Sequence, residues 1–468
     1  MSNRIQIVSP IDGSLFAERE LAGEAKILST VQSADAAQKQ WKQTRIAERA
    51  ALCHKAIDSM RDNTSELAEE ITRMMGRPVA HSPGEIRGLE QRARYMIDIA
   101  ERSLADIPVT AATESADTQR FSRYIRHEPL GLVLVLAPWN YPYLTAVNSI
   151  IPALMAGNTV ILKHSKQTLL CAERFQQAFT DAGLPAGVFQ YLHLDHEQTS
   201  KLIKHHSVQY VAFTGSVAGD KAIEHAAAGL FKGVALELGG KDPAYVMSDA
   251  DLDATVENLV DGAFYNSGQS CCGVERIYVY ADIYDAFVEQ FVDRVKQYRL
   301  DNPLDAETTL GPMVNAKAAE FVRGQISQAC AYGANACIDT MLFAADQPGS
   351  NYMAPQVLVD VNHDMAIMQQ ESFGPVVGIM KVRDDSEALE LMNDSDYGLT
   401  ASLWTRDETR AAELGEQVQA GTVFMNRCDY LDPALAWVGV KDSGRGCSLS
   451  SLGYQQLTRP KSFHLRKS

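Results

Sequence analysis

The sequence predicts an α/β fold of two domains, and the chain length and two changes of pattern support this. The chain has 468 residues, more than one hydrophobic core usually organises. Apolar residues recur at helical spacing through the first hundred residues, and short apolar strands alternate with helices from Phe121 onward. A second series of strands and helices follows Glu237. Such alternation is typical of parallel sheets covered by helices, so we expect two of them.

The individual elements follow from the spacing of apolar residues. Helices are expected over residues 34–43, 46–60, 65–75 and 85–104. Strands of the first sheet are expected over residues 131–136, 159–162 and 208–213, and strands of the second over 276–280, 376–381 and 422–425. The polar segment 110–119 is interpreted as a linker or an arm.

Composition excludes several classes of function. The net charge of −16 would repel a phosphate backbone, and no basic run offsets it, so nucleic acid is not expected as a partner. The chain lacks a signal peptide at its start and any run of about 18 apolar residues, so we expect a cytoplasmic protein without a membrane span. The eight cysteines are interpreted as reduced thiols, and no Cys/His cluster has zinc spacing, so no metal is expected.

Two adjacent cysteines, Cys271 and Cys272, stand after a glycine-containing turn and before an expected strand. A cysteine in such a place can be exposed at a domain boundary. The thiolate is the reactive form, and its ordinary pKa of about 8.5 means that the site must activate it. The alternative is that these are small buried apolar residues, which is the commoner use of cysteine.

Seven segments together resemble the aldehyde dehydrogenase family in order and spacing over nearly the whole chain. They are Ala137-Pro-Trp-Asn-Tyr-Pro142, Leu162-Lys163, Phe213-Thr-Gly-Ser216, Leu236-Glu-Leu-Gly-Gly-Lys241, Asn266-Ser-Gly-Gln-Ser-Cys271, Glu371-Ser-Phe-Gly-Pro375 and Lys441-Asp-Ser-Gly444. The resemblance implies a Rossmann-type cofactor domain (1–105 and 127–238), an α/β catalytic domain (239–438) and a small β oligomerisation arm (106–126 and 452–468) of a homodimer or homotetramer.

The resemblance also implies NAD(P)+-dependent oxidation of a small aldehyde to a carboxylic acid. Cys271 matches the family's nucleophile, Asn140 its side-chain donor to the oxyanion, and Glu237 the base that activates water for thioester hydrolysis. Asn140 is otherwise a turn residue before Tyr141-Pro142, and Glu237 an exposed carboxylate at a strand end.

The cofactor site implied by the resemblance lacks a Gly-x-Gly-x-x-Gly fingerprint. Its expected residues are Trp139, Lys163, Ser165, Lys166, Gly215, Ser216, Leu238, Glu371 and Phe373. Relatives that prefer NAD commonly have a glutamate where this chain has Lys166. A cation there can pair with a 2′-phosphate, with Ser165 donating a hydrogen bond, which favours NADP+ or dual use. A solvated lysine that leaves NAD+ preferred is the alternative.

The substrate pocket is the least specified part of the site. Its expected residues are Leu144, Thr145, Asn148, Cys272, Arg427, Asp429 and Leu431. Relatives that oxidise semialdehydes often have an arginine at the place of Asn148, and its absence weakens that interpretation. Arg427 is the candidate that would supply the charge instead, although a loop arginine is more often a solvated surface residue. Trp437-Val-Gly-Val440 also departs from the family's usual sequence.

Two other functions compete with the oxidoreductase. A coenzyme A-acylating or esterase variant would share the thioester and differ in what receives the acyl group. A catalytically inactive scaffold that binds a dinucleotide is the other alternative, and the presence of Cys271, Glu237 and Asn140 together argues against it.

Overall fold

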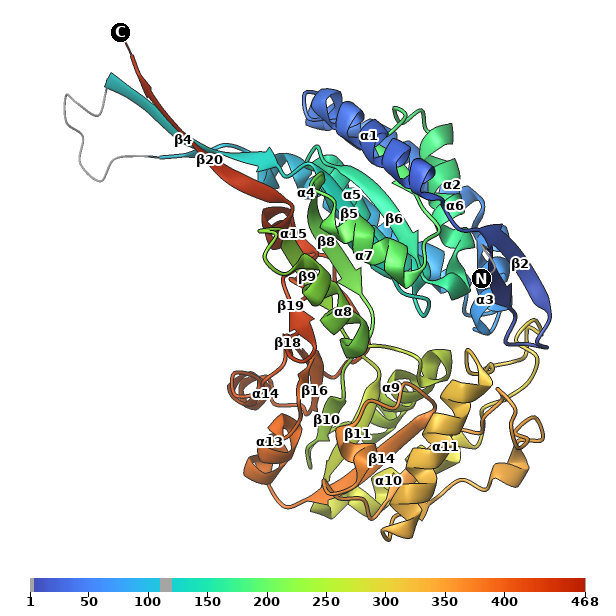
Figure 1. Ribbon diagram of the computed structural model, residues 1–468. Helices are drawn as coiled ribbons and strands as arrows, with labels where there is room; N and C mark the ends of the chain where they lie inside the picture. The colour runs from blue at the N-terminus through green and yellow to red at the C-terminus, as the bar shows by residue number, and fades with distance from the viewer. Residues whose placement is uncertain (1–3, 110–119, 468) are drawn as a thin grey trace.

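The computed structural model describes residues 4–109 and 120–467. The segment 110–119, which the sequence suggests as a linker or an arm, lies outside them. Figure 1 shows two α/β domains, one above the other, and a strand pair that projects away from the upper domain. The α/β class expected from the sequence is confirmed.

The upper domain is built on a six-stranded sheet in the order β19-β9-β8-β5-β6-β7. Its strands are β5 (Leu132–Ala137), β6 (Thr159–His164), β7 (Phe189–Tyr191), β8 (Val208–Thr214), β9 (Gly233–Glu237) and β19 (Gly444–Arg445). The first five are parallel, and β19 runs antiparallel to β9. Every residue of the central strand β5 is buried, as expected for a parallel strand covered on both faces.

Eight helices accompany this sheet: α1 (Glu24–Trp41), α2 (Ile46–Asp62), α3 (Thr64–Met75), α4 (Pro83–Ser103), α5 (Pro142–Met155), α6 (Leu170–Asp181), α7 (His196–Lys204) and α8 (Val217–Ala227). The first helix begins at Glu24, well before the expected start at residue 34. Tertiary packing explains the difference, because Val31 and Ala34 are buried in one cluster with Leu132 and Leu134 of β5. The burial of one face stabilises a helix whose local sequence is only a moderate helix former.

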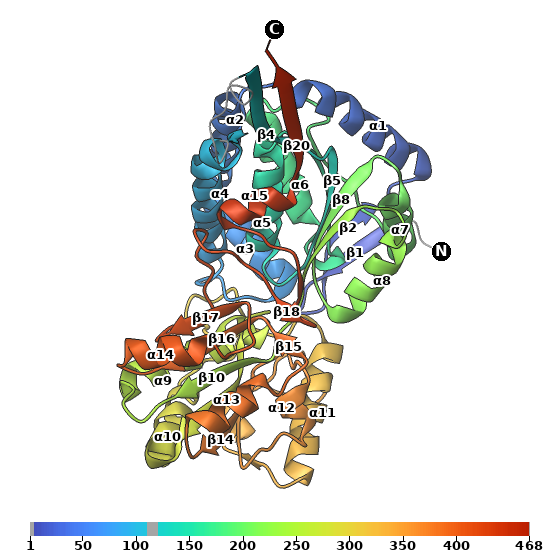
Figure 2. The ribbon, with the colours of Figure 1, turned by 90° about the vertical axis from the view of Figure 1, so that its left-hand side faces the viewer.

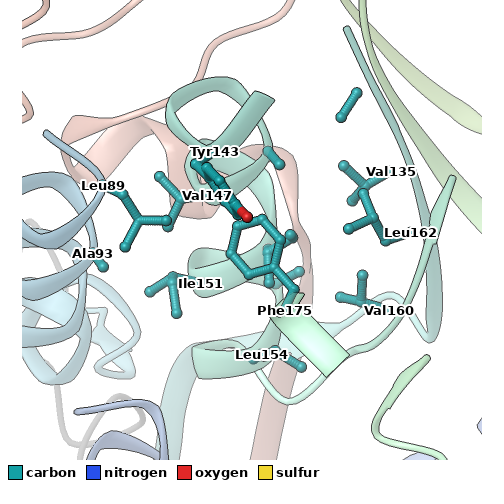
Figure 3. Close-up of a cluster of buried hydrophobic side chains, with 14 of the residues drawn as sticks. Leu89, Ala93, Val135, Tyr143, Val147, Ile151, Leu154, Val160, Leu162 and Phe175 are labelled. Atoms are coloured by element: carbon teal, nitrogen blue, oxygen red, sulfur yellow. The ribbon is translucent and has the colours of Figure 1, made fainter. Parts of the chain in front are cut away.

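The core that holds α5 lies between α4 and the sheet (Figure 3). In that view, side chains of α4 and the strands approach α5 from opposite sides. The residues are Leu89 and Ala93 of α4, Tyr143, Val147, Ile151 and Leu154 of α5, Phe175 of α6, and Val135, Val160 and Leu162 of the strands. Because α5 is buried on both sides, its position relative to α4 is fixed.

The lower domain contains a seven-stranded sheet in the order β12-β13-β14-β11-β10-β16-β17, parallel except for β12. Its strands are β10 (Asp242–Val246), β11 (Val274–Tyr280), β12 (Asn335–Ala336), β13 (Gln356–Val359), β14 (Val376–Val382), β16 (Thr400–Trp404) and β17 (Thr422–Met425). Its helices are α9 (Leu252–Phe264), α10 (Tyr284–Val295), α11 (Ala316–Ala331), α12 (Ala366–Gln369), α13 (Asp385–Asn393) and α14 (Glu408–Gly415). Figure 2 shows this domain below the first, with α14 and α13 on the near side.

The projecting arm consists of β3 (Ile107–Pro108), β4 (Phe121–Pro129) and β20 (Thr458–Arg466), in the order β20-β4-β3. The short helix α15 (Ser450–Gln456) leads into β20. Smaller pairs are formed by β1 (Arg4–Val8) with β2 (Leu15–Glu20), and by β15 (Tyr397–Gly398) with β18 (Val440–Lys441). Among the described residues, none of the helices has both the length and the apolar character needed to cross a membrane.

Candidate active site

Cys271 follows a tight turn in which three consecutive residues have left-handed backbone conformations. Asn266, Ser267 and Gly268 have φ of 56°, 57° and 67°. Only glycine adopts this region without strain, and an added Cβ at Gly268 would lie 2.1 Å from the Gly374 carbonyl oxygen. Side-chain bonds hold the strained residues, because the Ser267 hydroxyl donates to the Gly311 carbonyl at 2.8 Å and Asn266 Nδ2 to the Gln269 carbonyl at 3.0 Å. The turn leaves Cys271 partly exposed.

A buried ion pair between Arg77 and Glu85 joins this turn to α5. Arg77 is 2% exposed and donates to Glu85 Oε2 at 2.5 Å, to Asn266 Oδ1 at 3.1 Å and to the Asn140 carbonyl. The other oxygen of Glu85 accepts the backbone N–H groups of Tyr143 and Leu144, both at 2.9 Å, in the first turn of α5. A carboxylate is favourable at a helix N-terminus. Sequence reasoning missed this pair, since its partners are mostly backbone groups that only folding brings together.

Asn140 lies between β5 and α5, with its side chain directed at the nucleophile turn. It is 4% exposed, and its Nδ2 donates to the Gln269 carbonyl at 3.2 Å. A carboxamide carries two N–H donors, so one remains for another oxygen. The bonds from Arg77 and Asn266 to its carbonyl fix the Asn140 backbone. A donor held this firmly can stabilise developing negative charge with little reorganisation.

Glu237 is the last residue of β9 and lines a cavity together with Cys271. Burial raises the pKa of its carboxyl group above the ordinary range, while hydrogen bonds from Ser448 and Thr214 oppose the rise. The Thr214 hydroxyl donates to Glu237 Oε2 at 3.3 Å. A second, small cavity of about 20 Å³ lies beside Glu237 and is large enough for a water molecule. A carboxylate with a raised pKa next to water is suited to accept a proton.

A cavity of about 410 Å³ is lined by both Cys271 and Glu237. Six of the residues expected in a substrate pocket line it, together with Cys271 and Glu237: Leu144, Thr145, Asn148, Cys272, Asp429 and Leu431. Leu238, expected beside a cofactor, also lies in this wall, as does Trp437 of the atypical segment. The cavity combines apolar side chains with a few polar groups, which is typical of small-molecule sites.

Arg427 does not line this cavity. Its side chain is exposed, and its guanidinium lies 3.4 Å from the centre of the Tyr430 ring. The flanking Asn426 and Asp429 have positive φ, so the backbone turns sharply around it. The one arginine that the sequence offered for a substrate carboxylate therefore points elsewhere.

Cys272, unlike Cys271, is held as a buried thiol. It is 3% exposed, and its Sγ donates to Asp429 Oδ1 at 3.0 Å. The pKa of the Cys272 thiol is raised well above its ordinary value, first by its interaction with Cys271 and then by burial. Ser270 also donates to Asp429 at 3.0 Å. Cys272 therefore acts as a hydrogen-bond donor, and Cys271 is the more exposed of the two thiols that line the cavity.

Arg92, on α4, lines the cavity and had no signal in the sequence. It is 9% exposed, and its Nη1 donates to the Leu144 carbonyl at 3.0 Å and to Asn148 Oδ1 at 3.4 Å. In the sequence, Arg92 cannot be distinguished from any other charged residue on an amphipathic helix. Only the packing of α4 on α5 turns it toward the cavity.

The residues expected at the cofactor's phosphates and adenosine gather at the strand ends of the upper sheet. Lys163 lies at the end of β6, where burial lowers the pKa of its ammonium group. Ser165 caps the following turn by accepting the Gln167 N–H at 3.5 Å, and Lys166 beside it is exposed. Ser216 is the N-cap of α8, whereas the Gly215 N–H already donates to the Glu237 carbonyl at 3.0 Å.

The residues expected at the nicotinamide end meet between the domains. An added Cβ at Gly239 would lie 2.0 Å from Glu371 Oε1, so glycine is required there. Burial and the nearby Glu275 raise the pKa of Glu371 to about 8. The rings of Trp139 and Phe373 meet edge to face, with centroids 5.7 Å apart. A half-buried carboxyl group, a pair of aromatic rings, a half-buried lysine and the N-terminus of α8 fit the hydroxyl, ring and phosphate groups of a dinucleotide.

Comparisons with known proteins show the family of the chain. The family model described as "Aldehyde dehydrogenase family" matches residues 1–463. The chain is 33% identical to the succinate semialdehyde dehydrogenase [NAD(P)+] Sad of Escherichia coli (strain K12), over 96% of this chain and 95% of that protein. It is 34% identical to succinate-semialdehyde dehydrogenase [NADP(+)] 1 of Mycobacterium tuberculosis (strain ATCC 25618 / H37Rv), over 97% of each.

A solved structure gives the same result. The succinic semialdehyde dehydrogenase of Streptococcus pyogenes, in complex with NADP+ as the cofactor, superposes with a TM-score of 0.93 at 29% sequence identity. The match covers 99% of this chain and 100% of that one.

Proposed function

The chain belongs to the aldehyde dehydrogenase family, and we propose that Cys271, Asn140 and Glu237 carry out its oxidation of an aldehyde to a carboxylic acid. The observation that supports this most directly is that Cys271 and Glu237 line one cavity, with the Asn140 amide bonded to the turn that carries Cys271. Three elements far apart in sequence thus supply a nucleophile, an oxyanion donor and a base.

The steps follow from these positions. Cys271 Sγ attacks the aldehyde carbon, and the free N–H of the Asn140 amide stabilises the oxyanion of the resulting thiohemiacetal. NAD(P)+, when bound, supplies the acceptor for the hydride that leaves this carbon. Glu237 then takes a proton from water as the water adds to the thioester, and Cys271 departs as the thiolate. The presence of a carboxylate that can activate water favours this hydrolytic route over transfer to coenzyme A.

NADP+ is proposed as the preferred cofactor, with NAD+ as a second substrate of the same site. Lys166 is exposed at the end of β6, next to Ser165 and one turn beyond Lys163. A 2′-phosphate could accept hydrogen bonds from both side chains, whereas a ribose hydroxyl would gain little from a lysine. The names of the Mycobacterium tuberculosis and Escherichia coli relatives carry NADP(+) and NAD(P)+.

The substrate class proposed from the relatives is a short aldehyde with a carboxylate at its other end. The relatives described above are named for succinate semialdehyde. Apolar side chains such as Leu144 and Leu431 in the cavity would contact the intervening methylene groups.

The proposed domain roles are cofactor binding by residues 1–105 and 127–238, catalysis by 239–438, and assembly by 106–126 and 452–468. The role in assembly is supported by the arm itself, because β4 and β20 project from the body of the molecule (Figure 1). Tyr124 stacks on Phe463 in this arm, and Leu465 is 49% exposed. We infer a homodimer or homotetramer in which this arm contacts a second copy. A cytoplasmic location is proposed because all eight cysteines are free thiols.

The test uses purified protein with neutral, aromatic and ω-carboxylated aldehydes, and with NAD+ or NADP+ supplied separately. Reduced nicotinamide should form with wild-type protein, and Cys271→Ala should abolish its formation, while Cys272→Ala should retain it. Coenzyme A is added in a parallel arm, where formation of acyl-coenzyme A would contradict hydrolysis. Absence of reduction with every aldehyde, although the cofactor binds, would refute the proposed function.

A further inference from the structure

Arg92 is a buried cation without a counter-ion in the wall of the substrate cavity. It is 9% exposed, and only its Nη1 is engaged, by the Leu144 carbonyl at 3.0 Å and Asn148 Oδ1 at 3.4 Å. Across residues 4–109 and 120–467, no carboxylate forms an ion pair with it, and its Nε and Nη2 donate to no protein group. Burying an unpaired charge is costly, so such a group calls for a ligand that pairs with it.

The unengaged nitrogens of Arg92 face the cavity. Arg92 lines the same cavity as Cys271, and neither Nε nor Nη2 is among the fully enclosed polar atoms without a partner. Two N–H groups of one guanidinium form a planar fork that matches a carboxylate. Leu144 and Asn148 hold the fork in place from α5, so little side-chain freedom would be lost when an anion binds.

The acidic groups of the cavity interact with this charge only through space, because none of them forms an ion pair with Arg92. Glu85 is paired with Arg77 at 2.5 Å and also accepts two backbone N–H groups of α5. Burial raises the pKa of Asp429, which accepts hydrogen bonds from Cys272 and Ser270. Burial also lowers the pKa of the Arg92 guanidinium, which a bound anion would reverse. Glu237 and Asp261 also line the cavity, and neither forms an ion pair with Arg92, so no carboxyl group of the described residues is paired directly with it.

From this geometry we propose that Arg92 binds the distal carboxylate of the aldehyde substrate, with Asn148 as the residue that orients it. The inference rests on the proposed function, which supplies the aldehyde chemistry at Cys271. It assigns the charge recognition to α4, whereas the sequence offered only Arg427 and has Asn148 where semialdehyde-oxidising relatives often have an arginine. The asparagine at that place has a different role, because its Oδ1 accepts from Arg92 and leaves the rest of the guanidinium free.

The experiment compares 4-oxobutanoate with butanal, which have the same number of carbon atoms and differ in the distal carboxylate. Arg92→Met should lower kcat/KM for 4-oxobutanoate on the order of 100-fold, mainly through KM, because removing one member of a desolvated charge pair is costly. Butanal should be oxidised about as well as by the wild-type protein. Arg92→Lys should fall between the two, since it keeps the charge and loses the fork.

Two matched variants control the experiment. Arg94→Met makes the same change on another face of α4, where Arg94 pairs with Asp58 and Glu90, and should leave the preference between the two aldehydes unchanged. Arg427→Met tests the competing assignment. The proposal is overturned if Arg427→Met rather than Arg92→Met removes the preference, or if Arg92→Met and Arg92→Lys slow both aldehydes equally.

A binding measurement separates this inference from the proposed function. Succinate, which retains the distal carboxylate, should bind the wild-type protein in calorimetry and bind Arg92→Met at least about tenfold more weakly. If no aldehyde is oxidised but succinate binding still depends on Arg92, the proposed function fails and the anion site stands. If aldehydes are oxidised and succinate binding is the same in both proteins, the anion site fails alone.

Discussion

Two buried arginines in the same cavity have opposite surroundings. Arg77 engages all three nitrogens with Glu85, Asn266 and the Asn140 carbonyl, all supplied by the protein. Arg92, fifteen residues later in the chain, engages one nitrogen and pairs with no carboxylate of the described residues. Both are almost fully buried. Burial alone therefore does not say what a charged residue is for.

The two arginines therefore have different functions: Arg77 holds other residues of the site in position, whereas Arg92 is available to bind a substrate. Where the protein satisfies every donor itself, as around Arg77, the charge fixes the positions of other groups and is unavailable to a substrate. Where donors are left free in a cavity, as at Arg92, the missing partner has to come from a ligand or from water.

Replacing Glu237, the base proposed for thioester hydrolysis, should give the largest loss of turnover. Glu237→Gln keeps the size of the side chain and removes the base, so steady-state turnover should fall by about 100- to 10,000-fold. Reduced nicotinamide should still appear as a burst of one per active site, because the thioester forms before water is activated. Stopped-flow absorbance measures both phases. A variant with neither burst nor turnover would place Glu237 in an earlier step.

Replacing the supporting arginine should impair every substrate and the fold together. Arg77→Met leaves Glu85 buried and unpaired, which should lower the free energy of unfolding by about 3–5 kcal/mol. Oxidation of 4-oxobutanoate and of butanal should fall by the same factor, because Asn140 and the turn of Asn266 lose their anchor. Chemical denaturation and parallel kinetics measure the two effects. A selective loss for the carboxylated aldehyde would break the comparison with Arg92.

Replacing Lys166, the exposed lysine expected at the cofactor site, should have a moderate effect that is confined to the preference between NADP+ and NAD+. Lys166→Glu should shift the ratio of kcat/KM from NADP+ toward NAD+ by about 10- to 100-fold, the value of one or two hydrogen bonds to a charged group. Initial rates with each cofactor at a fixed aldehyde concentration give the ratio. Lys204→Glu, on α7, reverses a charge in the same domain and serves as the control. An unchanged ratio in Lys166→Glu would mean that the lysine is only solvated.

The smallest effect is expected from removing the hydrogen bond that Thr214 donates to Glu237, the proposed base. The Thr214 hydroxyl donates to Glu237 and lowers the pKa of that carboxyl, against the rise caused by burial. The ionised form is the acceptor, so Thr214→Val should raise the pKa of Glu237 further. Glu237 must be ionised to act, so the acid limb of the pH dependence of turnover should move to higher pH. A shift to lower pH would contradict this coupling.

The candidate reacting groups could be chosen from the sequence because each lies in a short contiguous motif. Cys271 and Glu237 were nominated on local patterns, and the structure brings them to one cavity. The supporting groups could not be found in this way. Arg77 and Glu85 act on backbone atoms of residues more than fifty positions away, and nothing in their own neighbourhood marks that contact.

The residues expected in the substrate pocket also differ in how well the sequence could locate them. Leu144 and Asn148, which were expected in the substrate pocket on the helix after Asn140, line the cavity. Arg427 was nominated for its charge, but the direction of a loop side chain depends on backbone angles that the sequence does not specify. The positive φ of Asn426 and Asp429 turns this loop so that Arg427 stacks on Tyr430.

By itself the sequence determined the α/β class, the family and the candidate nucleophile, base and oxyanion donor, because periodicity and short motifs are local properties of a chain. Only the tertiary structure decided which charges are paired. Arg92 lines the same cavity as Cys271 because the packing of α4 on α5 places it there. Whether a buried charge has a partner depends on contacts between distant segments, and those contacts exist only after the core has formed.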